Sequence, residues 1–298
     1  MRGRIGCAGL VLAGFVGFGV AVTLVAKARS GQERLYCANN LRQLGQFAAL
    51  PARLAPDRPL FSDEKARPAP DPEERRKLER QQAGPAEVPP GTVPNPRLAP
   101  DQRLSWVVPL LPALGGGRQD TRSLAEAIDP AAAWDAPAHR GLSRAPLEVL
   151  RCYGKTPGRP FNTPAVTQFV GAGGSGADAP ALAWPTPTRP HPRSGAFRYD
   201  GPTPFASITD GTSGTVLAAE TDRDLGPWLR GGPATLRPLA GDDAPIGSGR
   251  AFGGTHPGGG NLLFADHSVR FLSDRTPPAV LHGLFTAAGG ADDPVPGE

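Results

Sequence analysis

FGGTHPGGGNLLFADHSVRFLSD, residues 252–274, carries the clearest strand pattern in this chain. Apolar residues alternate with polar or small ones on both sides of Asp266–His267, as in two strands joined by a tight turn. A two-residue turn there puts four apolar side chains on one face, in two facing pairs: Phe264 with Val269, and Leu262 with Phe271. Because side chains alternate with period two, a shift of one residue would destroy this match. The stretch therefore predicts a β-hairpin with this register.

The turn gives Asp266 and His267 a structural role. A type I′ turn needs positive φ at both central residues, which usually selects Asp-Gly or Asn-Gly, although His tolerates this region at some cost. His256 lies in the glycine-rich loop before the hairpin, and a hydrogen bond that anchors this loop is its preferred role. His256, Asp266 and His267 also have the chemistry of metal ligands, but no spacing marks a further partner. We therefore expect no metal and no cofactor.

Residues 5–26, IGCAGLVLAGFVGFGVAVTLVA, contain no charged side chain. As a helix they would span about 33 Å, against about 30 Å for the hydrocarbon core of a bilayer. This predicts a single membrane span, with the lipid bilayer as a partner. A cleavable signal peptide is the alternative, because Ala26-Lys27-Ala28 has the small-x-small form of a cleavage site. The length of the apolar run favours an uncleaved anchor.

Small residues recur at every fourth position of this apolar segment, which on a helix would form one stripe. Such a stripe allows a second helix to approach closely, so self-association through it is one hypothesis. The general abundance of Gly and Ala in membrane helices is the other explanation. The residues concerned are Gly9, Ala13, Gly17 and Ala21.

Composition divides the chain into four parts. Residues 1–50 combine the anchor with a helix in which Leu35, Leu41, Leu44 and Phe47 have roughly helical spacing. Residues 51–103 hold twelve Pro and nineteen charged residues, which predicts a disordered insert. Residues 104–290 contain short β-rich runs with frequent turn signals, which predicts an α+β domain with an antiparallel sheet. Residues 291–298 are a tail.

The charge of the chain does not indicate a nucleic-acid-binding protein. The net charge is +4, with 32 Lys and Arg against 28 Asp and Glu. No basic run is interleaved with aromatic residues, and a basic balance without a basic patch is a weak signal. We expect no nucleic-acid partner.

Two of the three cysteines, Cys37 and Cys152, lie beyond the apolar segment. If this part of the chain is outside the cytoplasm, the two could form a disulfide. The bond would close a loop of about 115 residues, worth roughly 4 to 5 kcal/mol if it acts through chain entropy. Two free thiols are the alternative.

Several motifs, taken together and in order, resemble the prepilin-type, processing-associated family of planctomycete-like bacteria. That family is named for a His, nine residues, then Asp-Gly; here His256 is followed by nine residues, Asp266 and His267. SITDGTSGTVLAAE, residues 207–220, resembles the family's preceding strand motif, and CANNLRQLGQ, residues 37–46, resembles its post-membrane helix. The residues of the strand motif are Asp210, Gly211, Thr212, Ser213 and Glu220.

The resemblance implies a pilin-like architecture: a long N-terminal helix, half of it in the membrane, followed by an α+β head with an antiparallel sheet. It also makes the Cys37–Cys152 bridge more plausible, and it transfers no catalytic residue. The chain departs from the pattern at His267, where the family has Gly. It also lacks the prepilin cleavage start, because Gly6 is followed by Cys7 and the fifth position after Gly6 is Val11 rather than Glu.

We therefore expect a permanently anchored, single-pass protein of the inner membrane with its head outside the cytoplasm. We expect a structural or interaction role in the envelope or in a secretion system, and no enzymatic activity. Further copies of this chain or related pilin-like proteins are the expected partners. A minor pseudopilin that enters a filament is one alternative. A solute-binding or hydrolytic domain that uses His256, Asp266 and Glu220 is the second, and it requires these side chains to converge in one pocket.

Overall fold

The computed structural model describes residues 28–46, 87–114, 120–152, 160, 162–186, 188–241 and 245–290. The expected membrane segment with its small-residue stripe (residues 5–26), residues 51–86 of the expected insert and the tail 291–298 lie outside these ranges. Among the residues that the structure describes, no helix combines the length and the apolar character that crossing a membrane requires.

The N-terminal helix, described over residues 28–46, buries one stripe along its second half. Its buried positions follow the i, i+3, i+4, i+7, i+8 spacing of one helix face: Cys37, Asn40, Leu41, Leu44 and Gly45. Leu35, which the sequence analysis grouped with the apolar face, is 63% exposed, and Phe47 lies outside the described residues. The helix lies so close to the sheet that a Cβ added to Gly45 would be 2.7 Å from Leu263 Cδ1.

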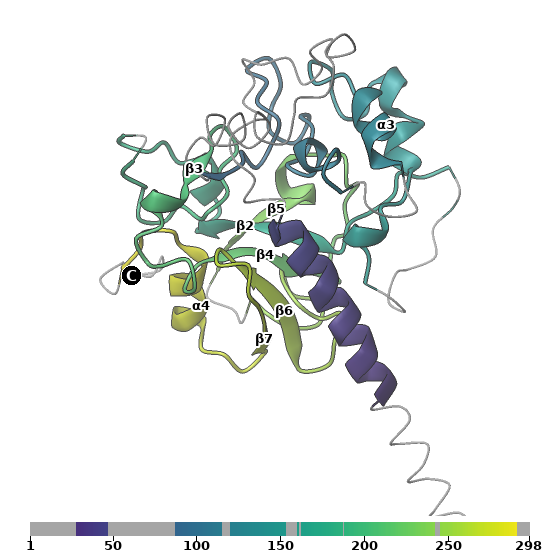
Figure 1. Ribbon diagram of the computed structural model, residues 1–298. Helices are drawn as coiled ribbons and strands as arrows, with labels where there is room; N and C mark the ends of the chain where they lie inside the picture. The colour runs from purple at the N-terminus through teal and green to yellow at the C-terminus, as the bar shows by residue number, and fades with distance from the viewer. Residues whose placement is uncertain are drawn as a thin grey trace, which may run out of the picture.

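A five-stranded sheet forms the centre of the fold, in the order β5–β2–β4–β6–β7 (Figure 1). The pairs β2–β4, β4–β6 and β6–β7 are antiparallel, but β5 runs parallel to β2, so the sheet is mixed rather than purely antiparallel. Two short strands, β1 and β3, pair separately. The strands are β1 (Glu87–Val88), β2 (Phe169–Ser175), β3 (Thr203–Pro204), β4 (Val216–Glu220), β5 (Leu236–Leu239), β6 (Gly259–Phe264) and β7 (Val269–Ser273).

Short helices complete the described fold. The α-helices after the N-terminal one are α3 (Thr121–Glu126) and α4 (Pro278–Phe285). Asp120 caps α3 by accepting a hydrogen bond from the Ser123 N–H at 3.0 Å. The 3-10 helices are η1 (Val108–Leu110), η2 (Pro137–His139), η3 (Leu142–Arg144), η4 (Glu148–Leu150), η5 (Ala179–Ala181), η6 (Phe205–Ser207) and η7 (Gly232–Ala234).

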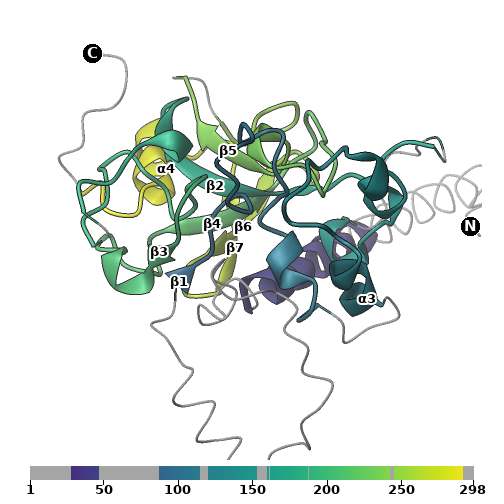
Figure 2. The same cartoon turned by 90° about the horizontal axis from the view of Figure 1, so that it is seen from above.

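Both faces of the sheet are covered. On one face the N-terminal helix packs with Trp106 and Leu263 in a large apolar cluster. On the other face α4 packs through Phe285 against Phe252 and its neighbours, with the two ring centroids 4.7 Å apart. Figure 2 shows the sheet between α4 and the N-terminal helix. The expected α+β class is confirmed, as three layers in which the inner strands are buried on both sides.

The hairpin predicted for residues 252–274 is present, but its predicted register is wrong by one residue. Leu263 pairs with Val269 and Leu262 pairs with Arg270. The His267 N–H donates to Phe264 O at 2.9 Å, and His267 has a φ of 65°. The connection is therefore a three-residue loop that ends in a left-handed residue. The predicted register assumed that one face of the hairpin is apolar and the other faces solvent, whereas all six residues of β6 are buried.

The predicted insert also ends earlier than expected. Residues 87–103 belong to the described fold: Val88 is fully buried in β1, and Arg103 is 7% exposed. Their polar groups find partners within the head, since Arg103 Nε donates to Leu98 O at 2.8 Å and Thr92 Oγ1 donates to Tyr199 O at 2.9 Å. Local composition could not reveal these partners.

Candidate functional site

A buried carboxyl group marks the end of the central strand β4. Glu220 has no exposed surface, and a buried charge is costly unless it is paired. Asn261, two residues into the neighbouring strand β6, donates to this carboxylate twice: its backbone N–H to Oε2 at 2.9 Å and its side-chain Nδ2 to Oε1 at 2.6 Å. The pairing of β4 with β6 thus fixes the orientation of the Glu220 side chain.

His256 reaches the same carboxylate from the glycine-rich loop before β6. Its Nε2 lies 3.4 Å from Glu220 Oε1, and its side chain is 3% exposed. The loop folds back on the sheet, because the Gly253 N–H donates to Glu220 O at 2.6 Å. A Cβ at Gly259 would overlap the carbonyl oxygen of Leu272, so only glycine permits β7 to approach at this point.

A disulfide between Cys37 and Cys152 closes the site from the side of the N-terminal helix. The structure shows the bonded alternative, with the two Cα atoms 5.1 Å apart and both residues fully buried. Cys152 Sγ lies 3.4 Å from His256 Nε2, and the Cys152 N–H donates to Gln168 Oε1 at 2.8 Å. The disulfide joins the N-terminal helix covalently to the segment that follows η4.

The four side chains Cys37, Cys152, Glu220 and His256, called here the buried cluster, come from four separate parts of the chain. Their sulfur, oxygen and nitrogen donor atoms all lie within 4.8 Å of one another. No local spacing in the sequence joins them. One feature of the sequence could have indicated a buried polar site: Asn261 lies inside the run GGNLLF, and a polar side chain in a buried strand needs a hydrogen-bond partner.

The structure separates the two ends of the His–Asp motif. His256 precedes β6, whereas Asp266 and His267 follow it; six strand residues at about 3.3 Å each put roughly 20 Å between the two ends. Asp266 instead closes the hairpin loop by accepting from the Ser268 N–H at 2.9 Å, and it pairs with Arg270 at 3.6 Å. The three residues considered as shared metal ligands therefore do not meet.

Asp210 and Gly211 also have structural positions. The Asp210 carboxylate accepts from the Gly289 N–H at 2.7 Å and the Gly290 N–H at 3.0 Å, which ties down the chain after α4. Gly211 has a φ of 87° and begins the turn before β4. The same turn holds the hairpin loop, because the Asp266 N–H donates to Thr212 O at 3.0 Å.

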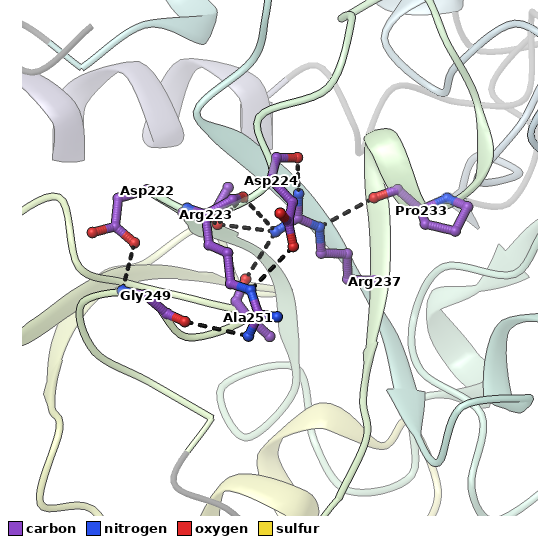
Figure 3. Close-up of polar contacts among 8 residues, drawn as sticks. Asp222, Arg223, Asp224, Pro233, Arg237, Gly249 and Ala251 are labelled. Atoms are coloured by element: carbon purple, nitrogen blue, oxygen red, sulfur yellow. Dashed lines mark hydrogen bonds and ion pairs between the residues drawn. The ribbon is translucent and has the colours of Figure 1, made fainter. Parts of the chain in front are cut away.

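A second polar cluster, which the sequence analysis missed, surrounds Arg237 on β5 (Figure 3). Its guanidinium is surrounded by backbone carbonyl groups and one hydroxyl rather than by a carboxylate, and burial lowers its pKa although Asp224 nearby raises it. Its acceptors are Pro233 O (3.1 Å), Thr221 Oγ1 (3.0 Å), Arg223 O (3.0 Å), Ala251 O (3.2 Å) and Asp224 O (2.7 Å). Arg237 thereby joins β5 to η7 and to the two loops that contain residues 221–224 and Ala251.

An open cleft of about 700 Å³ lies beside this second cluster. Asp101 and Arg230, which form an ion pair of 3.2 Å, belong to its walls together with Tyr199 and Asp224. The residues singled out in the sequence do not line it. The buried cluster and this cleft are thus separate features of the head.

Residues 85–244, more than half of the chain, match the family SBP_bac_10, described as "Protein of unknown function (DUF1559)". The chain belongs to this family. The match ends before the hairpin, so the motif of His256 and Asp266 lies outside it. No curated protein and no solved structure matches the chain.

Proposed function

We propose that this protein is a membrane-anchored, extracytoplasmic component of the cell envelope or of a secretion system, with a structural or interaction role. In this proposal residues 5–26 are the anchor, and the N-terminal helix carries the chain from the membrane to the head. The second half of that helix packs on the sheet, so the segment that follows the apolar residues is part of the head. The fold therefore supports a pilin-like head on a membrane stalk.

The observation that carries this proposal is the disulfide between Cys37 and Cys152. Disulfides persist in oxidising compartments and are rare in the cytosol. In this one, the first cysteine, Cys37, lies eleven residues after the apolar segment ends, and the bond fastens the N-terminal helix to the head. A bond at this place favours a head that folds outside the cytoplasm and remains fixed to its anchor.

The hydrolytic alternative has less support. It needs His256, Asp266 and Glu220 in one pocket, and β6 separates Asp266 from the other two. Glu220 and His256 do meet, but with 0% and 3% of their side chains exposed they do not face an open cleft. The buried cluster therefore favours a role in fastening the helix, the strands and the loop together.

The proposal is tested on native membranes. We expect the protein to stay in the membrane fraction after washing with alkaline carbonate, and a variant without residues 5–26 to be soluble. In freshly isolated envelopes, Cys37 and Cys152 should react with a maleimide–polyethylene glycol reagent only after reduction and unfolding. Free thiols at both positions, or release by carbonate, would overturn the proposal.

The intact mass of the protein from the same membranes decides between anchor and pseudopilin. A full-length mass, with or without the initiator Met, supports a permanent anchor. A mass that starts at Cys7 indicates prepilin-type processing and would replace the anchor with the pseudopilin alternative.

A further inference from the structure

The buried cluster has the composition of a zinc site as well as that of a disulfide. Two sulfurs, one imidazole nitrogen and one carboxylate oxygen are all ligand types that Zn²⁺ accepts, and structural zinc sites are tetrahedral with four protein ligands. We propose that, when the disulfide is reduced, Cys37, Cys152, Glu220 and His256 bind a thiophilic divalent cation of the zinc type. The site uses the reduced state of the two cysteines whose oxidised state supports the membrane role, and its test does not depend on that role.

Two of the distances between the donor atoms already match those of a tetrahedral site. With bonds of about 2.0 to 2.1 Å to N and O, two ligand atoms of a zinc tetrahedron lie about 3.4 Å apart, and a sulfur lies about 3.5 Å from a nitrogen. His256 Nε2 lies 3.4 Å from Glu220 Oε1 and 3.4 Å from Cys152 Sγ. His256 Nε2 therefore already has the spacing of a zinc ligand from two other donors, and all four donor atoms lie within 4.8 Å of one another. Cys37 Sγ must move away from Cys152 Sγ once the bond between them is broken.

The groups around the donors suit a metal site. Asn261 donates to both oxygens of the Glu220 carboxylate, and each oxygen retains a further lone pair that can bind a cation. The backbone N–H of Cys152 is held by Gln168 Oε1, which fixes the chain beside the sulfur. Such outer partners orient metal ligands and commonly affect affinity by about 10- to 100-fold. All four ligand residues are buried, so water would not compete strongly for the cation.

The redox balance of the site is simple. A dithiol reductant gives two electrons and two protons to the Cys37–Cys152 bond; its own two thiols become a disulfide, and the protein gains two thiols. Binding of the cation then releases two protons to solvent and leaves two thiolates on the metal. In the reverse direction a disulfide accepts two electrons from the two thiolates and two protons from solvent and becomes a dithiol; the Cys37–Cys152 bond forms again and the cation is released. The disulfide and the metal are thus alternative ways to fasten the N-terminal helix to the sheet.

Cobalt(II) is the probe for this site because its visible spectrum reports tetrahedral coordination. The full-length chain in detergent is reduced anaerobically with a phosphine, which is oxidised to its oxide, and is titrated with CoCl₂. We expect one equivalent to produce intense visible bands and a thiolate-to-cobalt charge-transfer band, with ZnCl₂ displacing both. The oxidised chain should show neither. Zinc should also raise the Tm of the reduced chain.

Two variants separate a four-ligand site from a simple dithiol. Glu220→Gln and His256→Asn should each weaken cobalt binding at least tenfold and alter the visible bands, whereas the exposed or half-buried counterparts Glu148→Gln and His191→Asn should bind as the original chain does. Cys37→Ser with Cys152→Ser should abolish the charge-transfer band. Binding unchanged in both Glu220→Gln and His256→Asn would overturn the proposal. So would a reduced original chain that gives no tetrahedral spectrum and no zinc-dependent rise in Tm, a result that does not depend on any variant folding.

Discussion

Asn261 gives the carboxylate of Glu220 two hydrogen bonds, from its backbone N–H at 2.9 Å and its side-chain amide at 2.6 Å. Asn261→Leu removes the second of these bonds without a large change in volume, together with a longer bond from the same amide to Arg34 O at 3.4 Å. Because hydrogen bonds to charged groups contribute about 1.5 to 3 kcal/mol, we expect the free energy of unfolding to fall by roughly 2 kcal/mol. Urea denaturation measures the loss. Asn95→Leu removes two exposed hydrogen bonds, one donated to Ala131 O and one accepted from the Arg97 N–H. Because neither involves a buried charged group, the free energy should change by about 1 kcal/mol or less; equal losses in the two variants would contradict the assignment.

The hairpin loop predicts a stabilising substitution. His267 has a φ of 65°, a left-handed conformation that costs a non-glycine residue about 1 to 2 kcal/mol. His267→Gly removes this cost but also the edge contact of His267 with the Phe205 ring, so we expect a net gain below about 1 kcal/mol, seen as a higher Tm. Ser268→Gly, one residue later and outside the left-handed region, should instead lower the Tm. A fall of Tm in both variants would argue against the three-residue loop.

Acid should weaken the same loop. Burial raises the pKa of Asp266, but hydrogen bonds from Ser268 and the nearby charges of Arg270 and His267 outweigh it and hold the pKa below its ordinary value of 3.8. A carboxyl whose pKa is lowered by folding stabilises the fold above its unfolded pKa, and this stability is lost as the pH falls through the folded value. The difference in stability between the original chain and Asp266→Asn should therefore be constant above about pH 5 and shrink below about pH 4. Urea unfolding at several pH values measures this difference, and one that grows in acid would contradict the assignment.

Arg237 is expected to be among the least replaceable side chains of the head. Its planar fork reaches five oxygen atoms on η7 and two loops (Figure 3), which the single ammonium of Lys cannot do. We expect Arg237→Lys to lower the free energy of unfolding by about 3 kcal/mol, because several bonds to a charged group are lost. Arg223→Lys is the matched control: Arg223 lies in the same cluster, but its side chain is 55% exposed. A loss of free energy of similar size in both variants would show that the five hydrogen bonds of Arg237 are not the cause of the loss.

The sequence was informative where structure is local. Alternation around Asp266–His267 predicted a hairpin, and helical spacing after the apolar segment predicted a helix. The register of that hairpin could not be predicted, because β6 lies inside a sheet covered on both faces and Leu262 and Leu263 are both buried. Alternation identifies the inner face only when the other face is in water. Strand β5 escaped notice because its four residues, LRPL, include a proline and an arginine.

The site was predictable only in part. The resemblance of residues 207–220 and 252–274 to known motifs brought Glu220 and His256 to attention, but assigned His256 a partner, Asp266, that lies at the far end of β6. Glu220 and His256 meet because β4 pairs with β6 and the loop folds back, and this long-range pairing leaves no trace in local spacing. The two cysteines were paired as one of two alternatives, yet nothing in the sequence placed them beside the histidine.

The disulfide also governs how the protein would respond to a mechanical pull. Cys37 and Cys152 are 115 residues apart in the chain, so tension applied to the first turns of the N-terminal helix passes across the bond directly to the middle of the head. Residues 38–151 lie outside this path, so the pull does not extend them while the bond is intact. At roughly 3.5 Å per residue, the bond hides about 400 Å of extension. After reduction the N-terminal helix is held to the head by its packing alone, so a pull strong enough to overcome that packing would draw out a much longer tether.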